Sequence, residues 1–193
     1  MINITTICLI RHGETDWNAQ RRIQGRTDIP LNEKGIQQAR ECRDFLKNSE
    51  WDVIITSPLK RAKQTAEIIN EALNIDLIEM DDFIEKSFGD VEGMTLQERR
   101  SAYPDRNYPN QEDDEAFSSR IQKGIEKIQE KYEHGKVILV AHGAVISTLL
   151  AILSDGKIGT GKTRLGNACI SNIHFHEGMW LIKDYNQISH LSN

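Results

Sequence analysis

Short apolar runs alternate along the chain with longer segments whose apolar residues recur every three or four positions. Four runs have the length and β-branched content of buried strands: residues 5–10 (TTICLI), 51–57 (WDVIITS), 77–80 (LIEM) and 136–142 (KVILVAH). Helical spacing is found in 31–48, 57–73, 112–133 and 143–154. Because alternating strands and helices favour a mostly parallel sheet covered on both faces, we predict an α/β protein, built as a three-layer α/β/α sandwich.

Local signals predict where several of these elements begin. Asn32 is suited to start the first helix, and Ser57 to cap the second, with Pro58 at its first helical position. The runs ACISNIHFH (168–176) and MWLIKDY (179–185) flank a short turn. We therefore predict an antiparallel hairpin at one edge of the central sheet.

Composition limits the class of protein. A chain of 193 residues is large enough to bury its own core, so we expect one domain over 1–193. The formal net charge of −5 gives no indication of a nucleic-acid or membrane partner, and a site for anions would need locally gathered basic residues. No run approaches the roughly 18 apolar residues of a membrane span, and the three cysteines lack metal-ligand spacing. We expect a cytoplasmic protein.

Polar residues stand where three of the predicted strands end. The first strand ends in Arg11-His12, the second leads into a helix that carries Arg61, and the fourth ends in His142-Gly143. In sheets of this kind, ligands bind beyond the carboxyl ends of the strands. Helix N-termini at the same edge add backbone N–H groups that favour a bound anion. These positions therefore predict a phosphate pocket.

Four blocks that contain these residues carry a family resemblance. LIRHGETDWN, SPLKRAKQTA, IEKSFGDVEG and LVAHGAVI follow one another in this order. Together they resemble the phosphoglycerate mutase-like branch of the histidine phosphatase superfamily, from about residue 5 to the closing hairpin. The resemblance implies the phosphoglycerate mutase-like fold and an enzyme that forms a phosphohistidine. It also implies roles for the matching positions: His12 as nucleophile, Arg11 and Arg61 as phosphate ligands, His142 as the second active-site histidine and Glu85 as proton donor.

The same resemblance implies a set of phosphate-binding positions around the nucleophile. They are Asn18, Arg22, Gln24 and Gly25 in one loop, with Gly143 at the start of the last helix. One departure is visible, because the segment often written WEG in relatives is Val91-Glu92-Gly93 here. From the residues alone, Glu85 is not separated from other nearby carboxylates, namely Glu79, Asp81, Asp82 and Glu92.

The chemistry of such a site needs no metal or cofactor. Neutral imidazole is a good nucleophile towards phosphorus, and adjacent guanidinium groups depress its pKa. Arginines grip phosphate oxygens with forked hydrogen bonds, and a protonated carboxyl group can supply the leaving oxygen with its proton. His174 and His176 share one face of a predicted strand, but no third ligand is evident. We therefore expect no metal site and interpret these two histidines as part of an exposed face.

Three functions are compatible with this pocket. A phosphatase lets water attack the phosphohistidine, whereas a phosphoglycerate mutase returns the phosphoryl group to substrate and must exclude water. The segment after Gly93 is short, and the local mutase pattern ERxYG is missing. We therefore favour a phosphatase of small phosphorylated metabolites, with mutase activity as the alternative and a non-catalytic phosphate-binding module as a third candidate. The oligomeric state is left open.

Residues 94–117 are interpreted as a short cap that selects substrate within the domain. The aromatic residues of this segment would suit a bulky apolar leaving group, and its arginines would suit a second phosphate. The sequence does not choose between these two interpretations. The residues concerned are Met94, Tyr103, Tyr108, Phe117, Arg99, Arg100 and Arg106.

Overall fold

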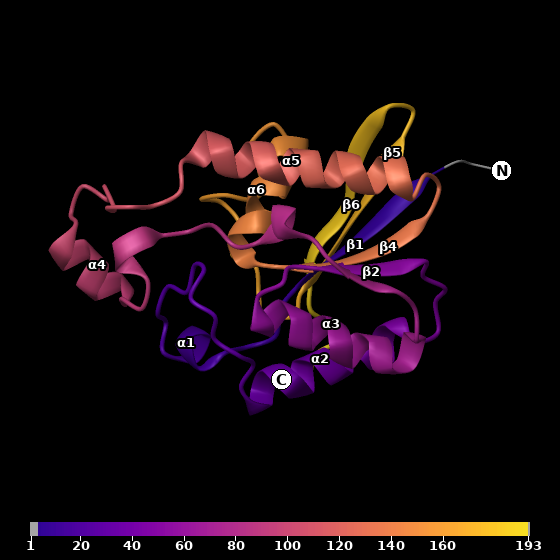
Figure 1. Ribbon diagram of the computed structural model, residues 1–193, viewed down its shortest axis with the longest axis horizontal. Coiled ribbons are helices and arrows are strands. Elements are labelled where there is room, and N and C mark those ends of the chain that lie inside the picture. The colour runs from indigo at the N-terminus through magenta and orange to yellow at the C-terminus, as the bar shows by residue number, and fades with distance from the viewer. Residues whose placement is uncertain (1–3, 193) are drawn as a thin grey trace.

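A six-stranded sheet forms the centre of the computed structural model, which describes residues 4–192 (Figure 1). The strands are β1 (Thr5–Arg11), β2 (Val53–Thr56), β3 (Leu77–Glu79), β4 (Lys136–Ala141), β5 (Ile170–His176) and β6 (Met179–Gln187), in the spatial order β3-β2-β4-β1-β5-β6. The pairs from β3 to β1 are parallel, whereas β5 is antiparallel to both β1 and β6. The predicted parallel sheet with an antiparallel edge hairpin is confirmed.

Helices cover both faces of this sheet (Figure 1). α2 (Glu33–Leu46) and α3 (Lys60–Leu73) lie on one face, and α5 (Asp114–Lys131) and α6 (Gly143–Leu153) lie on the other. Each face has its own apolar core. Cys42 and Ile69 pack on Ile54 in the first core, whereas Ile121 and Leu149 join Leu139 in the second. Alternate residues of the strands supply the two cores, and the predicted three-layer sandwich is confirmed.

The starts of α2 and α3 differ in how well the sequence predicts them. Asn32 caps α2 as predicted, and its side chain accepts a hydrogen bond from Gly35 N at 2.8 Å. The predicted cap at Ser57 is wrong, because α3 begins at Lys60 and its N-cap residue makes no side-chain bond. A distant loop supplies the acceptor instead, since Lys60 N donates to Asp28 Oδ1 at 2.7 Å. Ser57 Oγ accepts from Leu59 N, at 3.3 Å, and lies 2.7 Å from His142 Nε2.

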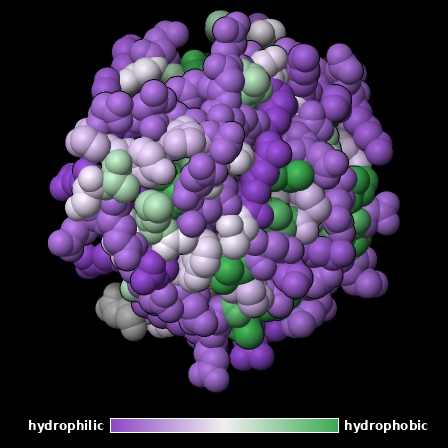
Figure 2. Space-filling view, turned by 60° about the vertical axis from the view of Figure 1, so that its left-hand side comes forward, coloured by the Kyte–Doolittle hydropathy of each residue, from purple (hydrophilic) through white to green (hydrophobic). Residues whose placement is uncertain are grey.

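Smaller elements gather beyond the carboxyl ends of the parallel strands (Figure 1). They are α1 (Asp16–Ala19), α4 (Leu96–Ala102) and two 3₁₀ turns, Asp81–Phe83 and Gly89–Val91. Hydrophilic residues predominate on the surface seen in Figure 2, and apolar residues form small separate groups there. Among residues 4–192, none of the helices combines the length and apolar composition needed to cross a membrane. The proposed domain limits, 1–193, include four terminal positions that lie outside the described residues.

Candidate active site

His12 follows the last residue of β1 and is only 2% exposed. Its Nδ1 lies 2.7 Å from Gly13 O, and because a carbonyl oxygen only accepts, Nδ1 carries the proton. Nε2 is then unprotonated, and its lone pair accepts a hydrogen bond from Arg61 Nε at 3.3 Å. Burial, followed by the charges of Arg61 and Arg11, holds the pKa of His12 well below 6.5. The predicted nucleophile is therefore a neutral imidazole with Nε2 facing Arg61.

Arg61 lies in the first turn of α3 and is held by the loop that follows α1. Its Nη1 donates to Thr27 O at 2.9 Å and its Nη2 to Gly25 O at 2.7 Å. Burial lowers the pKa of Arg61 to about 10, and the group stays charged at neutral pH. Gly25 has φ of +54°, and a Cβ atom there would lie 2.0 Å from Glu92 Oε1. The loop can therefore reach Arg61 only with glycine at this position.

Arg11 and His142 each present a buried polar atom that has no partner in the described residues. Arg11 Nη1 donates to Leu165 O at 2.6 Å, but Nε is unpaired. His142 Nε2 lies 2.7 Å from Ser57 Oγ, but Nδ1 is unpaired. The imidazole rings of His12 and His142 are 5.3 Å apart. Because buried polar groups are almost always satisfied, two such atoms in one place indicate where a polar ligand binds.

Glu85 is 7% exposed and lies against the start of α6. Its Oε2 accepts from Ala144 N at 3.1 Å and its Oε1 from Lys86 N at 2.9 Å. Burial raises the pKa of Glu85, although the two backbone bonds and the charges of Arg61 and Arg11 act in the opposite direction. A carboxyl group with a raised pKa is suited to exchange a proton.

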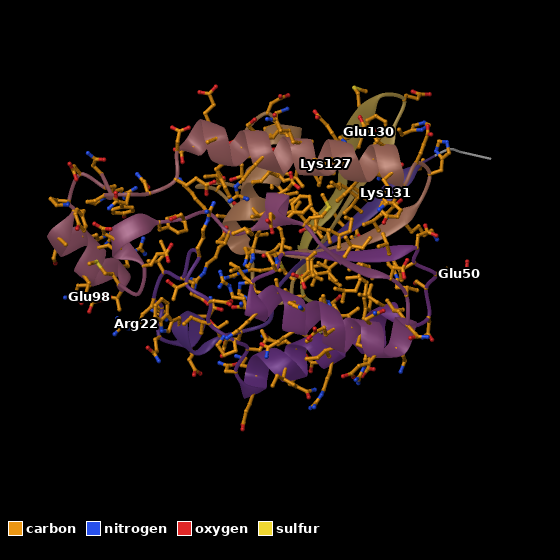
Figure 3. The ribbon with its side chains drawn as sticks, viewed as in Figure 1. Arg22, Glu50, Glu98, Lys127, Glu130 and Lys131 are labelled. Atoms are coloured by element: carbon orange, nitrogen blue, oxygen red, sulfur yellow. The ribbon has the colours of Figure 1, made fainter. Side chains whose placement is uncertain are left out.

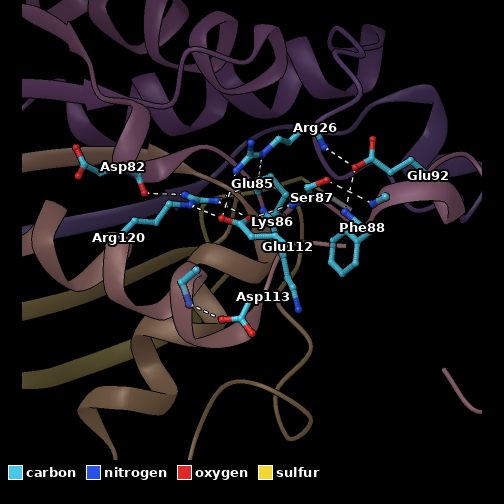
Figure 4. A network of polar contacts seen from close by, with 12 residues as sticks. Arg26, Asp82, Glu85, Lys86, Ser87, Phe88, Glu92, Glu112, Asp113 and Arg120 are labelled. Atoms are coloured by element: carbon cyan, nitrogen blue, oxygen red, sulfur yellow. Dashed lines mark hydrogen bonds and ion pairs between the residues drawn. The ribbon is translucent and has the colours of Figure 1, made fainter. Parts of the chain in front are cut away.

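A polar network fixes the backbone around Glu85 (Figure 4). Arg120 donates to Asp82 O at 2.8 Å and to Glu85 O at 3.2 Å. Glu112 joins this network by pairing with Arg120 at 2.8 Å and with Arg26 at 3.2 Å. The pKa of Glu112 is lowered by its hydrogen bonds to Arg120 and Ser87 against the cost of burial. These contacts connect the segment that carries Glu85 to α5 and to the loop that holds Arg61.

The structure separates Glu85 from the other carboxylates that the sequence left open. Glu79 pairs with Lys63 at 2.6 Å and Asp82 with Lys127 at 2.9 Å, both on the outside of the molecule. Asp81 is exposed. Glu92 accepts from Thr27 N, Thr27 Oγ1 and Phe88 N, at 3.0, 2.6 and 3.0 Å. It therefore stabilises the loop after α1, which holds Arg61.

The phosphate-side residues predicted from the resemblance fall into two groups. Asn18, Arg22 and Gly143 line the pocket. Gln24 is buried behind it and accepts from Thr15 Oγ1 at 2.8 Å, and Gly25 contacts Arg61 through its carbonyl oxygen. Gly143 stands close to Arg11, because an added Cβ would lie 3.3 Å from Arg11 Nε.

A pocket of about 1030 Å³ opens beside these residues. It is strongly basic, with Asp114 as the acidic residue of its wall, and α4, α5 and α6 contribute apolar side chains. The basic residues are Arg11, Arg21, Arg22, Lys86, Arg99 and Arg164, and the larger apolar ones are Phe88, Leu96, Phe117, Ile152 and Leu165.

Only part of the predicted cap lines this pocket. From residues 94–117, Leu96, Arg99, Asp114 and Phe117 take part. Arg22 Nη1 connects the cap to the loop after α1 by donating to Gly93 O at 2.7 Å and pairing with Glu98 at 3.3 Å (Figure 3).

Sequence reasoning missed several residues that hold the site. Thr65 Oγ1 accepts from Gly13 N at 3.1 Å, and Asn167 Nδ2 donates to His12 O at 3.3 Å. Thr65 carries a usable signal, since it lies one helical turn after Arg61 on the same face. Asn167 carries none, because residues 155–168 show neither helical nor strand periodicity. Within residues 4–192, no group of three or more histidine, cysteine or acidic side chains is arranged to hold a metal ion.

A family model described as "Histidine phosphatase superfamily (branch 1)" matches residues 7–188. The chain belongs to this superfamily. The resemblance inferred from the four blocks is confirmed, and the match includes most of β1, His12 and the whole edge hairpin.

The chain is similar to proteins named as phosphatases and to proteins named as mutases. The chain is 55% identical over 189 residues to "Uncharacterized phosphatase PhoE" of Bacillus subtilis, covering 98% of each chain. It is 32% identical over 204 residues to "Probable phosphoglycerate mutase GpmB" of Proteus mirabilis, covering 97% of this chain and 95% of that one. A solved structure of phosphoserine phosphatase from Entamoeba histolytica, in complex with 3-phosphoglyceric acid, superimposes with a TM-score of 0.85 at 30% identity. That match covers 97% of this chain and all (100%) of the other, and the predicted fold is confirmed.

Proposed function

We propose that the protein is a phosphatase that hydrolyses small phosphomonoesters through a phosphohistidine at His12. The observation that carries this proposal is the hydrogen bond from His12 Nδ1 to Gly13 O, which leaves Nε2 unprotonated and facing Arg61. Family membership and the phosphatase-named relatives support the same reaction class. A purely phosphate-binding module would need neither an oriented nucleophile nor a buried carboxyl group beside it.

In the first step, His12 Nε2 attacks phosphorus as the bond from phosphorus to the ester oxygen breaks. Arg11, Arg61 and His142 donate to the phosphoryl oxygens, and the N-terminus of α6 adds its positive dipole end. Glu85 gives its proton to the departing oxygen, because an alkoxide is a poor leaving group. In the second step, Glu85 takes a proton from water, the hydroxide attacks phosphorus, and the bond to Nε2 breaks. Inorganic phosphate leaves, and Glu85 is protonated again.

The pocket supports a small phosphorylated metabolite as substrate. Its basic wall suits an anionic compound, and its apolar wall suits a leaving group with some hydrophobic surface. The three cysteines are buried and unpaired, which fits the proposed cytoplasmic location. We also keep the proposal of one domain over 1–193 with residues 94–117 as its cap, because α4 and the start of α5 supply part of the pocket wall.

Phosphoglycerate mutase activity is the second candidate, and one observation favours it. The basic residues around the pocket provide more positive charge than a single phosphate requires, as a bisphosphorylated intermediate would need. An assay with 3-phosphoglycerate and its bisphosphate primer separates the two reactions. We expect release of inorganic phosphate and little 2-phosphoglycerate. Efficient interconversion with slow phosphate release would make the mutase the principal activity.

The proposal is tested by trapping the intermediate. Acid-labile phosphate should appear on the peptide LIRHGETDWN when the enzyme is denatured during turnover, and His12→Ala should abolish both the label and the activity. His176→Ala, on the partly exposed edge hairpin, is the matched control and should behave as wild type. Label on another residue, or an active His12→Ala enzyme, would contradict the mechanism.

A further inference from the structure

Residues 164–169 hold the end of β1 from outside the sheet. Arg11 Nη1 donates to Leu165 O at 2.6 Å, and Arg11 N donates to Cys169 O at 3.2 Å. Ala168 N donates to His12 O at 3.2 Å. Both residues at the tip of β1 are therefore positioned by main-chain groups of this one segment, which itself has no regular secondary structure.

Asn186, near the end of β6, makes two side-chain hydrogen bonds to the same segment. Its Oδ1 accepts from Gly166 N at 3.0 Å, and its Nδ2 donates to Arg164 O at 3.2 Å. The C=O of Leu165 and the N–H of Gly166 belong to one planar peptide group and point in opposite directions. That peptide is therefore bonded to Asn186 on one side and to the Arg11 guanidinium on the other.

The backbone of Asn186 is itself fixed. Its φ is +52°, a left-handed conformation that asparagine tolerates better than most residues. Its N–H donates to Ser171 Oγ at 3.0 Å, and Ser171 lies fully buried in β5. The side-chain amide therefore starts from a defined position on the sheet.

We propose that Asn186 is a positioning residue of the active site, which orients the Arg11 guanidinium through the peptide group between Leu165 and Gly166. The inference rests on the proposed role of Arg11 as a phosphate ligand. Because Nη1 is committed to Leu165 O, the direction of that carbonyl decides where the unpaired Nε of Arg11 points. Without Asn186, the peptide loses the bond that opposes its rotation, and the guanidinium loses its orientation towards the phosphoryl group.

The test replaces Asn186 with glycine. Glycine adopts a φ of +52° without strain, and Asn186 is only partly buried, so the variant should fold. We expect kcat/KM for p-nitrophenyl phosphate to fall about tenfold, since small misplacements of a catalytic group cost one to two orders of magnitude. Affinity for inorganic phosphate, measured by calorimetry, should fall with it. Asn74→Gly is the matched control, because Asn74 has φ of +51° at the far end of α3.

A double-mutant cycle distinguishes positioning from a general structural role. If Asn186 acts through Arg11, Asn186→Gly should cost less than about twofold in an Arg11→Met background. An equal tenfold loss in both backgrounds would overturn the proposal, and so would wild-type kcat/KM and phosphate affinity in the single variant. Failure of the proposed function is a separate outcome, because it would appear as a wild-type enzyme that neither releases phosphate nor labels His12.

Discussion

The floor of the active site, meaning the buried residues His12, Arg61, Glu85 and His142, is held in the opposite way to the cap. On the floor, Arg61 and His142 are 1% and 0% exposed, and main-chain carbonyls fix the Arg61 guanidinium. In the cap, Leu96 is 48% exposed, and the ion pair between Arg22 and Glu98 has side chains 35% and 52% exposed.

The floor is therefore the rigid part of the site, and the cap is the adjustable part. A buried charged group held by peptide groups in a low-dielectric interior has one orientation, because leaving it unpaired is costly. An exposed ion pair contributes only about 0–1 kcal/mol, and the side chains of the cap can rearrange around different substrates. The chemistry should therefore depend steeply on single floor residues, and cap residues should affect chiefly which esters are accepted.

Glu85→Gln should show the largest effect in this comparison. With an alkyl phosphate, kcat should fall about 10²–10⁴-fold, because the alkoxide then leaves without a proton. With p-nitrophenyl phosphate, formation of the phosphohistidine should suffer much less, and a burst of nitrophenol should precede slow hydrolysis. Stopped-flow measurements on both esters test this, with Glu79→Gln, on the outer ion pair with Lys63, as control. Equal losses on both esters would instead assign Glu85 to structure or binding.

Gly25→Ala should damage the floor indirectly. The new Cβ would collide with Glu92 Oε1, and φ of +54° would strain alanine, so the free energy of unfolding should fall by about 1–3 kcal/mol. Displacement of Gly25 O would release Arg61 Nη2, and kcat/KM should fall about tenfold. Urea unfolding and steady-state kinetics give both numbers. Gly178→Ala, with φ of +78° and open space around it, should reproduce the strain and keep full activity.

Low pH should lower the free energy of unfolding, because two histidines are buried in the floor of the site. Burial holds the pKa values of His12 and His142 well below 6.5, so the folded protein binds fewer protons there than the unfolded chain. The free energy of unfolding should therefore fall as the pH drops below about 6.5, by at most about 1.4 kcal/mol per pH unit for each histidine.

The raised pKa of Glu85 acts in the opposite sense, stabilising the fold on the acid side of its folded-state pKa. Urea unfolding, repeated at several pH values between 5 and 8, measures this dependence. The free energy of unfolding should change less steeply with pH in His12→Asn than in wild type. An unchanged slope would mean that His12 is not held neutral by burial.

Glu98→Gln should have the smallest effect. Glutamine keeps the capping box with Thr95 but breaks the ion pair with Arg22. We expect kcat to stay unchanged, KM to shift by less than about threefold, and the free energy of unfolding to change little, because solvent screens an exposed ion pair. Glu71→Gln breaks the exposed pair with Arg43, at 2.8 Å, and is the matched control for stability. A collapse of kcat in Glu98→Gln would show that the cap takes part in the chemistry.

The strand tips were predictable because the physics that places them is local. A run as short and rich in β-branched residues as KVILVAH favours a buried strand, and a parallel α/β sheet brings the carboxyl ends of its strands to one edge. Arg11, His12 and His142 could therefore be placed together before any coordinates. The cap of α3 could not, since Asp28 reaches Lys60 N from a loop that no sequence spacing connects to it.

The succession of the main strands and helices along the chain, the family and the residues at the strand tips could be predicted from sequence, because periodicity and short motifs are properties of neighbouring residues. The folded chain was needed to show which carboxylate is buried beside the arginines and which loop holds Arg61. It was also needed to show that Asn186 lies against the peptide bonded to Arg11. Those outcomes depend on hydrogen bonds between segments far apart in the chain. Their partners are single polar residues in loops and at strand ends, where no repeating pattern marks them.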